Sequence, residues 1–257
     1  VAINQSNNIV DAHISAQRDY TQSGNPIKAG ATNSSIDGAS VSVAASDKMT
    51  SINVAGGVAI SKNIAGGAGV GVNLMGNAVS ANIDSADVNA TAGVNVTATA
   101  DSTLVSVAVG GAGSSKFALG AAVSVNQVDN DISASVTDSR DLNATVAGDK
   151  AEITAVGAVN IAAADSTSMI VVAGGVAGSA KGAIGAGVGT TEVDNSIKSY
   201  ISGANVSSSG GDISVTAGFA PSTGSTDLKS MGINVDNMPD DVDMGSQIIN
   251  VAIGAAG

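Results

Sequence analysis

The sequence predicts an all-β protein, a repetitive β-solenoid-like stack, and two observations lead to this prediction. First, a short frame is written four times, beginning at Asn8, Asn77, Asn130 and Asn195. In each copy a β-branched residue, a small residue and another β-branched residue follow at +2, +4 and +6. Second, apolar and polar residues alternate through most of the chain, which places one set on a single face of a strand. Repetition in a fixed order is typical of repeat architectures.

A β-sandwich of long glycine-rich hairpins is the alternative fold. Each copy contains a Gly-Gly pair, a lysine and a second glycine-rich run, which resembles two strands around a turn. The composition is compatible with either fold, because 44% of the 257 residues are hydrophobic but only 2% are aromatic. A core without Phe, Tyr or Trp for bulk must be thin and regular, and a deep enzyme pocket would be hard to build from it. The regular alternation argues against disorder as the reason for the high glycine content.

The net charge of −12 excludes a typical nucleic-acid binder, which needs a basic surface. Glycine and polar residues interrupt every apolar run before it reaches the roughly 18 residues of a membrane helix, so we expect no membrane insertion. The absence of cysteine and the acidic balance suit an extracellular or cell-surface protein. The chain has neither an initiator methionine nor a signal peptide, so we expect a processed chain or a piece of a longer one.

The repeats divide a single repetitive β domain that covers 1–257. In order, we expect the second half of a repeat at 1–16, a loop insertion at 17–35, repeats at 36–93, 94–151 and 152–217, a second loop insertion at 218–247, and the first half of a repeat at 248–257. The asparagines of the frame are 69, 53 and 65 residues apart. With about 20 residues per coil, each copy would make three coils of a solenoid.

Glycine-rich strands recur in every copy, as in residues 66–71. Glycine in a strand costs conformational entropy and is tolerated where another backbone approaches closely. The pattern therefore predicts a tightly apposed pair of sheets or close packing against a neighbouring molecule. The frame asparagines themselves have two interpretations: a ladder of stacked side-chain amides along the repeat axis, or residues that tolerate the turn before a strand.

The run 120–126, the frame that begins at Asn130 and the Thr-Ala repeats of 94–100 resemble a family of large repetitive secreted bacterial adhesins and exoproteins. These are the filamentous haemagglutinin-like and leukotoxin-like repeat proteins. The resemblance rests on composition and rhythm and covers nearly the whole chain outside the two insertions. It implies a secreted, elongated, β-rich rod that acts in attachment or in a biofilm matrix, with host or matrix glycans as partners. It carries no catalytic residues.

Few residues suggest chemistry. An acidic cluster is a candidate calcium site because carboxylates are hard oxygen ligands, with a solvated loop as the alternative; its members are Asp236, Asp240, Asp241 and Asp243. We expect no other cofactor, since His13 is the only histidine and there is no cysteine. A carbohydrate-binding or carbohydrate-cleaving β-helix module is the alternative function. Sugar cleavage needs paired carboxylates and usually aromatic platforms, so we expect no enzyme.

Lysines follow the Gly-Gly pairs by five or six residues, at Lys62, Lys116 and Lys181. They either present a row of positive charges to an acidic neighbour or are solvated turn residues that discourage edge aggregation.

The two ends of the chain predict a head-to-tail homopolymer in which each junction completes a repeat. Residues 248–254 resume the strand that 52–54 occupy in the first copy, and 253–257 followed by 1–4 approximate the run 119–126. Unpaired strand edges promote strand addition, and a heterologous contact that does not close generates a filament. The expected assembly residues are Val1, Ile3, Val10, Ile14, Ile248, Ile249, Val251 and Ile253.

Overall fold

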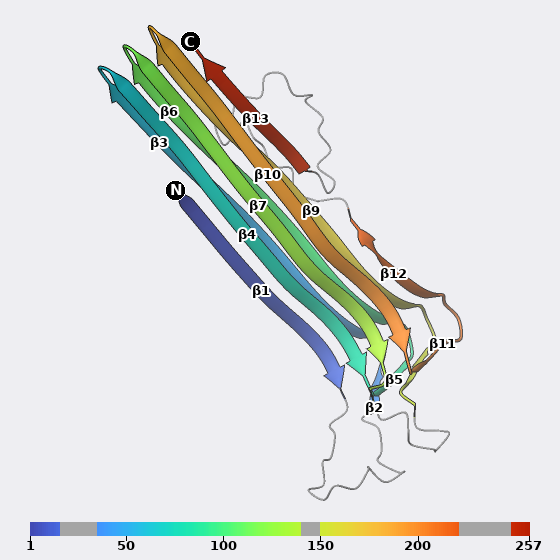
Figure 1. Cartoon of the computed structure of the whole chain (residues 1–257). Helices are drawn as coiled ribbons and strands as arrows, with labels where there is room; N and C mark the ends of the chain where they lie inside the picture. Colours follow the sequence, from blue (N-terminus) through green and yellow to red (C-terminus); the bar gives the residue numbers. More distant parts are fainter. Residues whose placement is uncertain (16–34, 140–149, 221–247) are drawn as a thin grey trace, which may run out of the picture.

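The computed structural model describes residues 1–15, 35–139, 150–220 and 248–257, and these residues form a three-sided β-solenoid (Figure 1). All strand pairs are parallel. Sheet A consists of β1 (Ala2–Ser15), β4 (Ile64–Asp84), β7 (Phe117–Thr137) and β10 (Gly182–Ser202). Sheet B consists of the short strands β2 (Ser35–Gly38), β5 (Asp87–Ala90), β8 (Glu152–Ala155) and β11 (Asn205–Ser208). Sheet C consists of β3 (Val41–Ser61), β6 (Val94–Ser114), β9 (Val159–Ser179) and, both beside β9, β12 (Ile213–Phe219) and β13 (Ile248–Ala256).

One copy of the repeat makes one coil, and the expectation of three coils of about 20 residues is wrong. The chain runs along sheet C, turns, returns along sheet A, crosses sheet B and begins the next coil (Figure 1). Successive coils lie in register, so that Val41 is beside Val94 and Val94 is beside Val159. The polar pair 46–47 lies inside the continuous strand β3. The hairpin alternative also fails, because β3 and β4 belong to different sheets and pair only with strands of other coils.

The coils begin with β3, β6 and β9, so the predicted repeat boundary at 94 is confirmed, whereas the predicted boundaries at 36 and 152 are too early. The difference arises because the short strands β2 and β8 each close the preceding coil in sheet B. Ser35 belongs to β2, and Gly218 and Phe219 belong to β12, although the predicted insertions 17–35 and 218–247 included them. Apart from residues 35 and 218–220, both insertions lie outside the described residues.

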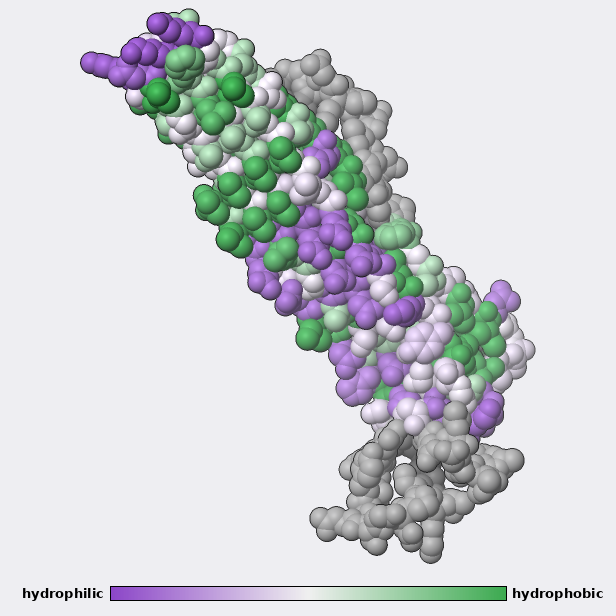
Figure 2. Space-filling model, in the orientation of Figure 1, coloured by the Kyte–Doolittle hydropathy of each residue, from purple (hydrophilic) through white to green (hydrophobic). Residues whose placement is uncertain are grey.

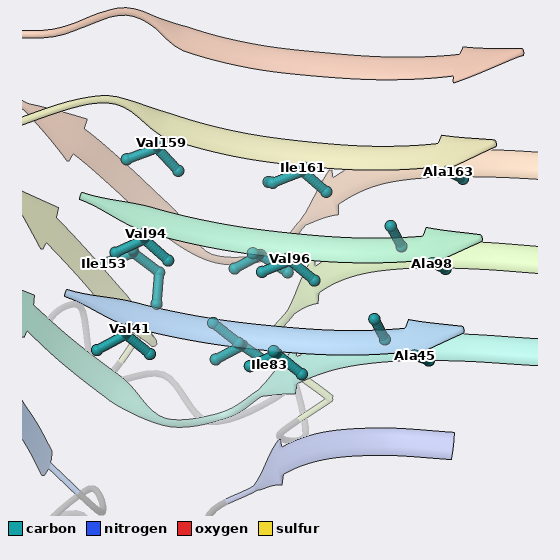
Figure 3. Close-up of a cluster of buried hydrophobic side chains, with 14 of the residues drawn as sticks. Val41, Ala45, Ile83, Val94, Val96, Ala98, Ile153, Val159, Ile161 and Ala163 are labelled. Atoms are coloured by element: carbon teal, nitrogen blue, oxygen red, sulfur yellow. The ribbon is translucent and has the colours of Figure 1, made fainter. Parts of the chain in front are cut away.

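The widest part of the interior lies beside sheet B and is filled by Val, Ile and Ala from all three sheets (Figure 3). The apolar residues at +2 and +6 of the two middle frames are buried in it, as predicted: Val79, Ile83, Ile132 and Val136. Their counterparts in β1 and β10 are half-buried against the same core, because these strands lie at the two ends of sheet A. The period-two pattern of the frame therefore specifies the core face of sheet A.

The interior narrows from this core towards the turns that join sheet C to sheet A. A layer of Met, Leu and Val lies beyond the row of frame asparagines, and closer to the turns is a layer of alanines. Near the turns the two sheets meet backbone to backbone: a Cβ added to Gly110 would overlap the carbonyl oxygen of Ala121, and one added to Gly67 would overlap that of Gly111. The glycine-rich strands therefore permit close apposition of two sheets within one chain, which is the first of the two predicted explanations.

Candidate assembly surfaces

The frame asparagines form a ladder inside the solenoid. Asn8, Asn77, Asn130 and Asn195 are neighbours in adjacent strands of sheet A. The amide Nδ2 of Asn77 donates to Oδ1 of Asn130 at 3.0 Å, and the backbone N–H of Asn130 donates to Oδ1 of Asn195 at 3.1 Å. All four lie within strands rather than before them, so the turn interpretation is wrong. The predicted bond between side-chain amides is present for Asn77 and Asn130, whereas the amides of Asn8 and Asn195 donate to Asp47 and Asp165 of sheet C.

A buried carboxylate faces this ladder from sheet C. Asp165 is 0% exposed and accepts hydrogen bonds from Nδ2 of Asn130 at 3.1 Å, Nδ2 of Asn195 at 2.7 Å and the hydroxyl of Thr167 at 3.1 Å. Burial raises the pKa of Asp165, and these three hydrogen bonds only partly offset that effect, so the pKa stays above its ordinary value. The frame asparagines are therefore part of a buried polar layer. At the last full coil, this layer includes the ionisable carboxyl group of Asp165.

A second asparagine row lies four residues before the first, and it was not among the predicted features. Nδ2 of Asn73 donates to Oδ1 of Asn126 at 2.6 Å, and Nδ2 of Asn4 donates to the hydroxyl of Ser51 across the interior at 2.6 Å. The spacing of four residues between two asparagines, present in three of the four copies, was the available signal. Together the two rows fix the register of sheet A, because a slip by one residue would move the buried amides to the outer face.

The two ends of the solenoid carry open strand edges. Sheet A ends with β1 on one side and β10 on the other, and no described strand pairs with their outer edges. The N–H of Gly182 donates to the carbonyl of Lys116, and the carbonyl of Ser202 accepts from Asp138, so the even-numbered residues of β10 bond to β7. Backbone groups alternate along a parallel strand, so the odd-numbered residues of β10 direct theirs towards the open edge.

The same alternation defines the open edge of β1. The N–H of Phe117 donates to the carbonyl of Asn63, which shows that residues with outward side chains bond towards the amino-terminal end of the stack. Ile9 has an outward side chain that is 84% exposed, so its N–H and C=O face away from β4.

Of the expected assembly residues of the amino end, Ile3, Val10 and Ile14 lie on β1, and Val1 directly precedes this strand. Val1 and Ile3 are exposed on or beside its outer face, whereas Val10 and Ile14 are half-buried against the core. Those of the carboxyl end lie on β13, with Ile249 and Val251 half-buried and Ile248 and Ile253 exposed; β13 is the end of sheet C.

Residues 248–254 occupy the same strand position as residues 52–54 of the first copy, as predicted. Asn250 lies in one row with Val171, Ser106 and Asn53. The expected joining of 253–257 with 1–4 into one strand is wrong. Gly254 is beside Gly175 in sheet C, whereas residues 2–4 are beside 71–73 in sheet A. Both glycine-rich runs have similar composition, and composition alone did not distinguish the strand before the turn from the strand after it.

The remaining candidates contribute little chemistry. Asp236, Asp240, Asp241 and Asp243 lie outside the described residues, and within the described part of the chain no group of three or more His, Cys, Asp or Glu side chains could hold a metal ion. His13 is on the outer face of β1, where its Nδ1 lies 2.9 Å from Oδ2 of Asp11. The described residues include no helix that is long and apolar enough to span a bilayer. No family model, curated protein or solved structure matches this chain.

Proposed function

We propose that this chain is a structural subunit of an extracellular fibre and that copies of it assemble head to tail by strand addition. The observation that carries the proposal is that the two ends of the solenoid are complementary on all three sides. At the carboxyl end, sheet C is one level ahead of sheet A, since β12 and β13 already lie on β9 while β10 is uncovered. At the amino end, β1 of sheet A and β2 of sheet B lie one level before β3 of sheet C.

A single placement of a second copy extends every sheet at once. If its β1 lies on β10, the register of the chain puts Asn8 beside Asn195 and Ile14 beside Ile201. The same placement puts β2 on β11, and β3 on β12 and β13, with Val41 beside Ile213. The asparagine ladder then continues across the junction without a change of register.

Burial favours this contact. The half-buried side chains of Val10, Ile14, Ile197 and Ile201 would gain the surroundings that make Ile132 fully buried. Completing the burial of four such residues contributes on the order of 1 kcal/mol each. The strand edges add parallel backbone hydrogen bonds of the kind already made between coils. A contact of this heterologous type does not close, so it yields a filament.

The wider role that we propose is attachment or matrix formation outside the cell, with a structural rather than a catalytic contribution. The acidic, cysteine-free composition and the rhythm shared with repetitive adhesins support this proposal. Host or matrix glycans are the proposed ligands of the fibre. A glycan array combined with a polysaccharide-degradation assay tests this part, and turnover of a polysaccharide by the pure protein would overturn the structural assignment.

Replacing Ile9 by proline tests the assembly. The N–H of Ile9 faces the open edge and its side chain is exposed, so proline removes a donor that only a second copy would use. We expect the wild type to form filaments in electron micrographs, and Ile9→Pro to remain short with an unchanged melting temperature. The control Ile9→Thr keeps the N–H and should still assemble. A wild-type chain that stays short at high concentration, or filaments of Ile9→Pro, would contradict the proposal.

A further inference from the structure

An apolar band covers the outer face of sheet A beside the turns that join sheet C to sheet A (Figure 2). It lies over the half of the solenoid in which the two sheets are closely apposed. Its largest exposed side chains are between 39% and 71% exposed, although they are Val, Ile, Leu or Phe: Ile64, Phe117, Leu119, Val125, Ile184 and Val188. A contiguous exposed apolar surface of this kind is typical of an interaction site.

Charged residues lie at the two ends of the band, with opposite signs at the two ends. At the turns are the exposed lysines Lys62, Lys116 and Lys181. At the other end are exposed carboxylates, among them Asp129 and Asp194, which are direct neighbours on β7 and β10. Within the described residues none of these five side chains forms an ion pair. Like charges beside each other in a sheet are destabilising, so the acidic end favours a cationic partner.

We propose that a second copy of this chain packs its sheet A face to face on this band, antiparallel about a twofold axis. Read from the turns, the surface is positive, then apolar, then negative, and the same surface turned end for end is its complement. Each copy then sets its lysines against the carboxylates of the other. A twofold contact requires such a self-complementary surface.

The shape of the band agrees with this arrangement. A row of alanines, with Ala121 in the middle coil, crosses the band near its centre, and the next outward row is valine, with Val123 in the middle coil. About the twofold axis, the valine row of one copy lies over the alanine row of the other, so ridges meet a shallow groove. The centre of the band is also within about half a residue of the midpoint between Lys116 and Asp129, so the charge pairing has nearly the same axis.

The area is that of a modest interface. From the row of Phe117 to the row of Gln127 the strands extend about 36 Å, and three strands are about 14 Å wide, which gives roughly 500 Å² per copy. The total of about 1,000 Å² is at the lower limit for a specific contact, and a filament would repeat it along its length. On the outer face of sheet C, by contrast, Lys48 is already paired with Asp101 at 3.2 Å.

A charge swap tests the face-to-face contact separately from the head-to-tail one, because all variants carry Ile9→Pro to block the open edge. One variant has Lys116→Glu and Lys181→Glu, and the other has Asp129→Lys and Asp194→Lys. In sedimentation velocity we expect the parent to form a dimer that weakens with salt. Each variant alone should bind itself at least tenfold more weakly. An equimolar mixture should dimerise, because every facing charge is again opposite.

The control Lys198→Glu lies on the same face beyond the carboxylates and should leave dimerisation unchanged, and circular dichroism verifies that each variant is folded. The proposal fails if both variants dimerise as tightly as the parent, or if the mixture binds no more tightly than either variant. It also fails if the parent stays monomeric and instead sediments with neutral phosphatidylcholine vesicles in a manner that Leu119→Asp abolishes. In that case the band binds a lipid surface.

Discussion

Shortening Ile132 to alanine tests whether the asparagine frames form the core of the stack. Ile132 lies in the middle of sheet A, its side chain is 0% exposed, and its neighbours are Val79 and Ile197. The change removes three carbons, which is worth about 2.4 kcal/mol of transfer free energy at about 0.8 kcal/mol each. Neighbouring coils hold the layer open on both sides, so a cavity remains and increases the cost. We expect the free energy of unfolding to fall by about 3–4 kcal/mol.

The matched control for this prediction is Ile197→Ala. Ile197 occupies the same row in β10 but is only half-buried, because no described strand covers that side. With Ile9→Pro present to keep the chain short, we expect Ile197→Ala to cost about half as much as Ile132→Ala. Urea unfolding followed by circular dichroism measures both losses. Equal losses at the two positions, or a loss below about 1 kcal/mol at Ile132, would refute the assignment of the frame to the core.

Two further substitutions test the narrow half of the solenoid and the polar layer. Gly110→Ala should lower the melting temperature strongly, because the added carbon overlaps the backbone of Ala121, whereas Gly174→Ala has open space around it and should leave the melting temperature unchanged or raise it; similar effects would contradict the close apposition. The pKa of Asp165 is raised in the folded state, so the folded chain binds the proton of this carboxyl group more tightly than the unfolded chain does. The contribution of Asp165 to stability therefore falls as the pH rises from the ordinary pKa of Asp through the raised pKa. The stability of Asp165→Asn relative to wild type, measured by urea unfolding at several pH values, should therefore increase across that window, and a difference independent of pH would show that Asp165 does not titrate as inferred.

The faces of the strands were predictable from the sequence, but the path of the chain was not. The frame at Asn130 places apolar residues at even spacing, and that local pattern is enough to identify the buried side of β7. The length of a coil depends on where the chain turns. The strand β3 continues through the polar pair 46–47, and the buried Asp47 there accepts a hydrogen bond from Asn8, which is 39 residues away. A hydrogen bond over that separation leaves no local signal.

The candidate assembly surfaces were only partly predictable for the same reason. The strand at 248–254 was assigned to the correct row, because Asn250 and Asn53 mark equivalent positions in similar surroundings. Whether a glycine-rich run belongs to sheet A or sheet C depends on its place before or after the turn, and both runs have nearly the same residues. The apolar band on sheet A became recognisable only when the outward residues of three coils were brought side by side.

The use of one long coil per repeat has a mechanical consequence. The four strands of sheet A, at about 4.8 Å spacing, occupy only about 19 Å along the axis, whereas one long strand of 21 residues extends about 70 Å across it. A fibre assembled in the proposed way would be a ribbon. It would be wide across the strands, and each added chain would extend it by only a short distance along the axis. Tension along the axis is distributed over the hydrogen bonds of two 21-residue strands and one 4-residue strand in every complete coil, all loaded together. In the proposed fibre, the force needed for rupture would therefore increase with the width of the ribbon, and each added coil would lengthen the fibre by only about 4.8 Å.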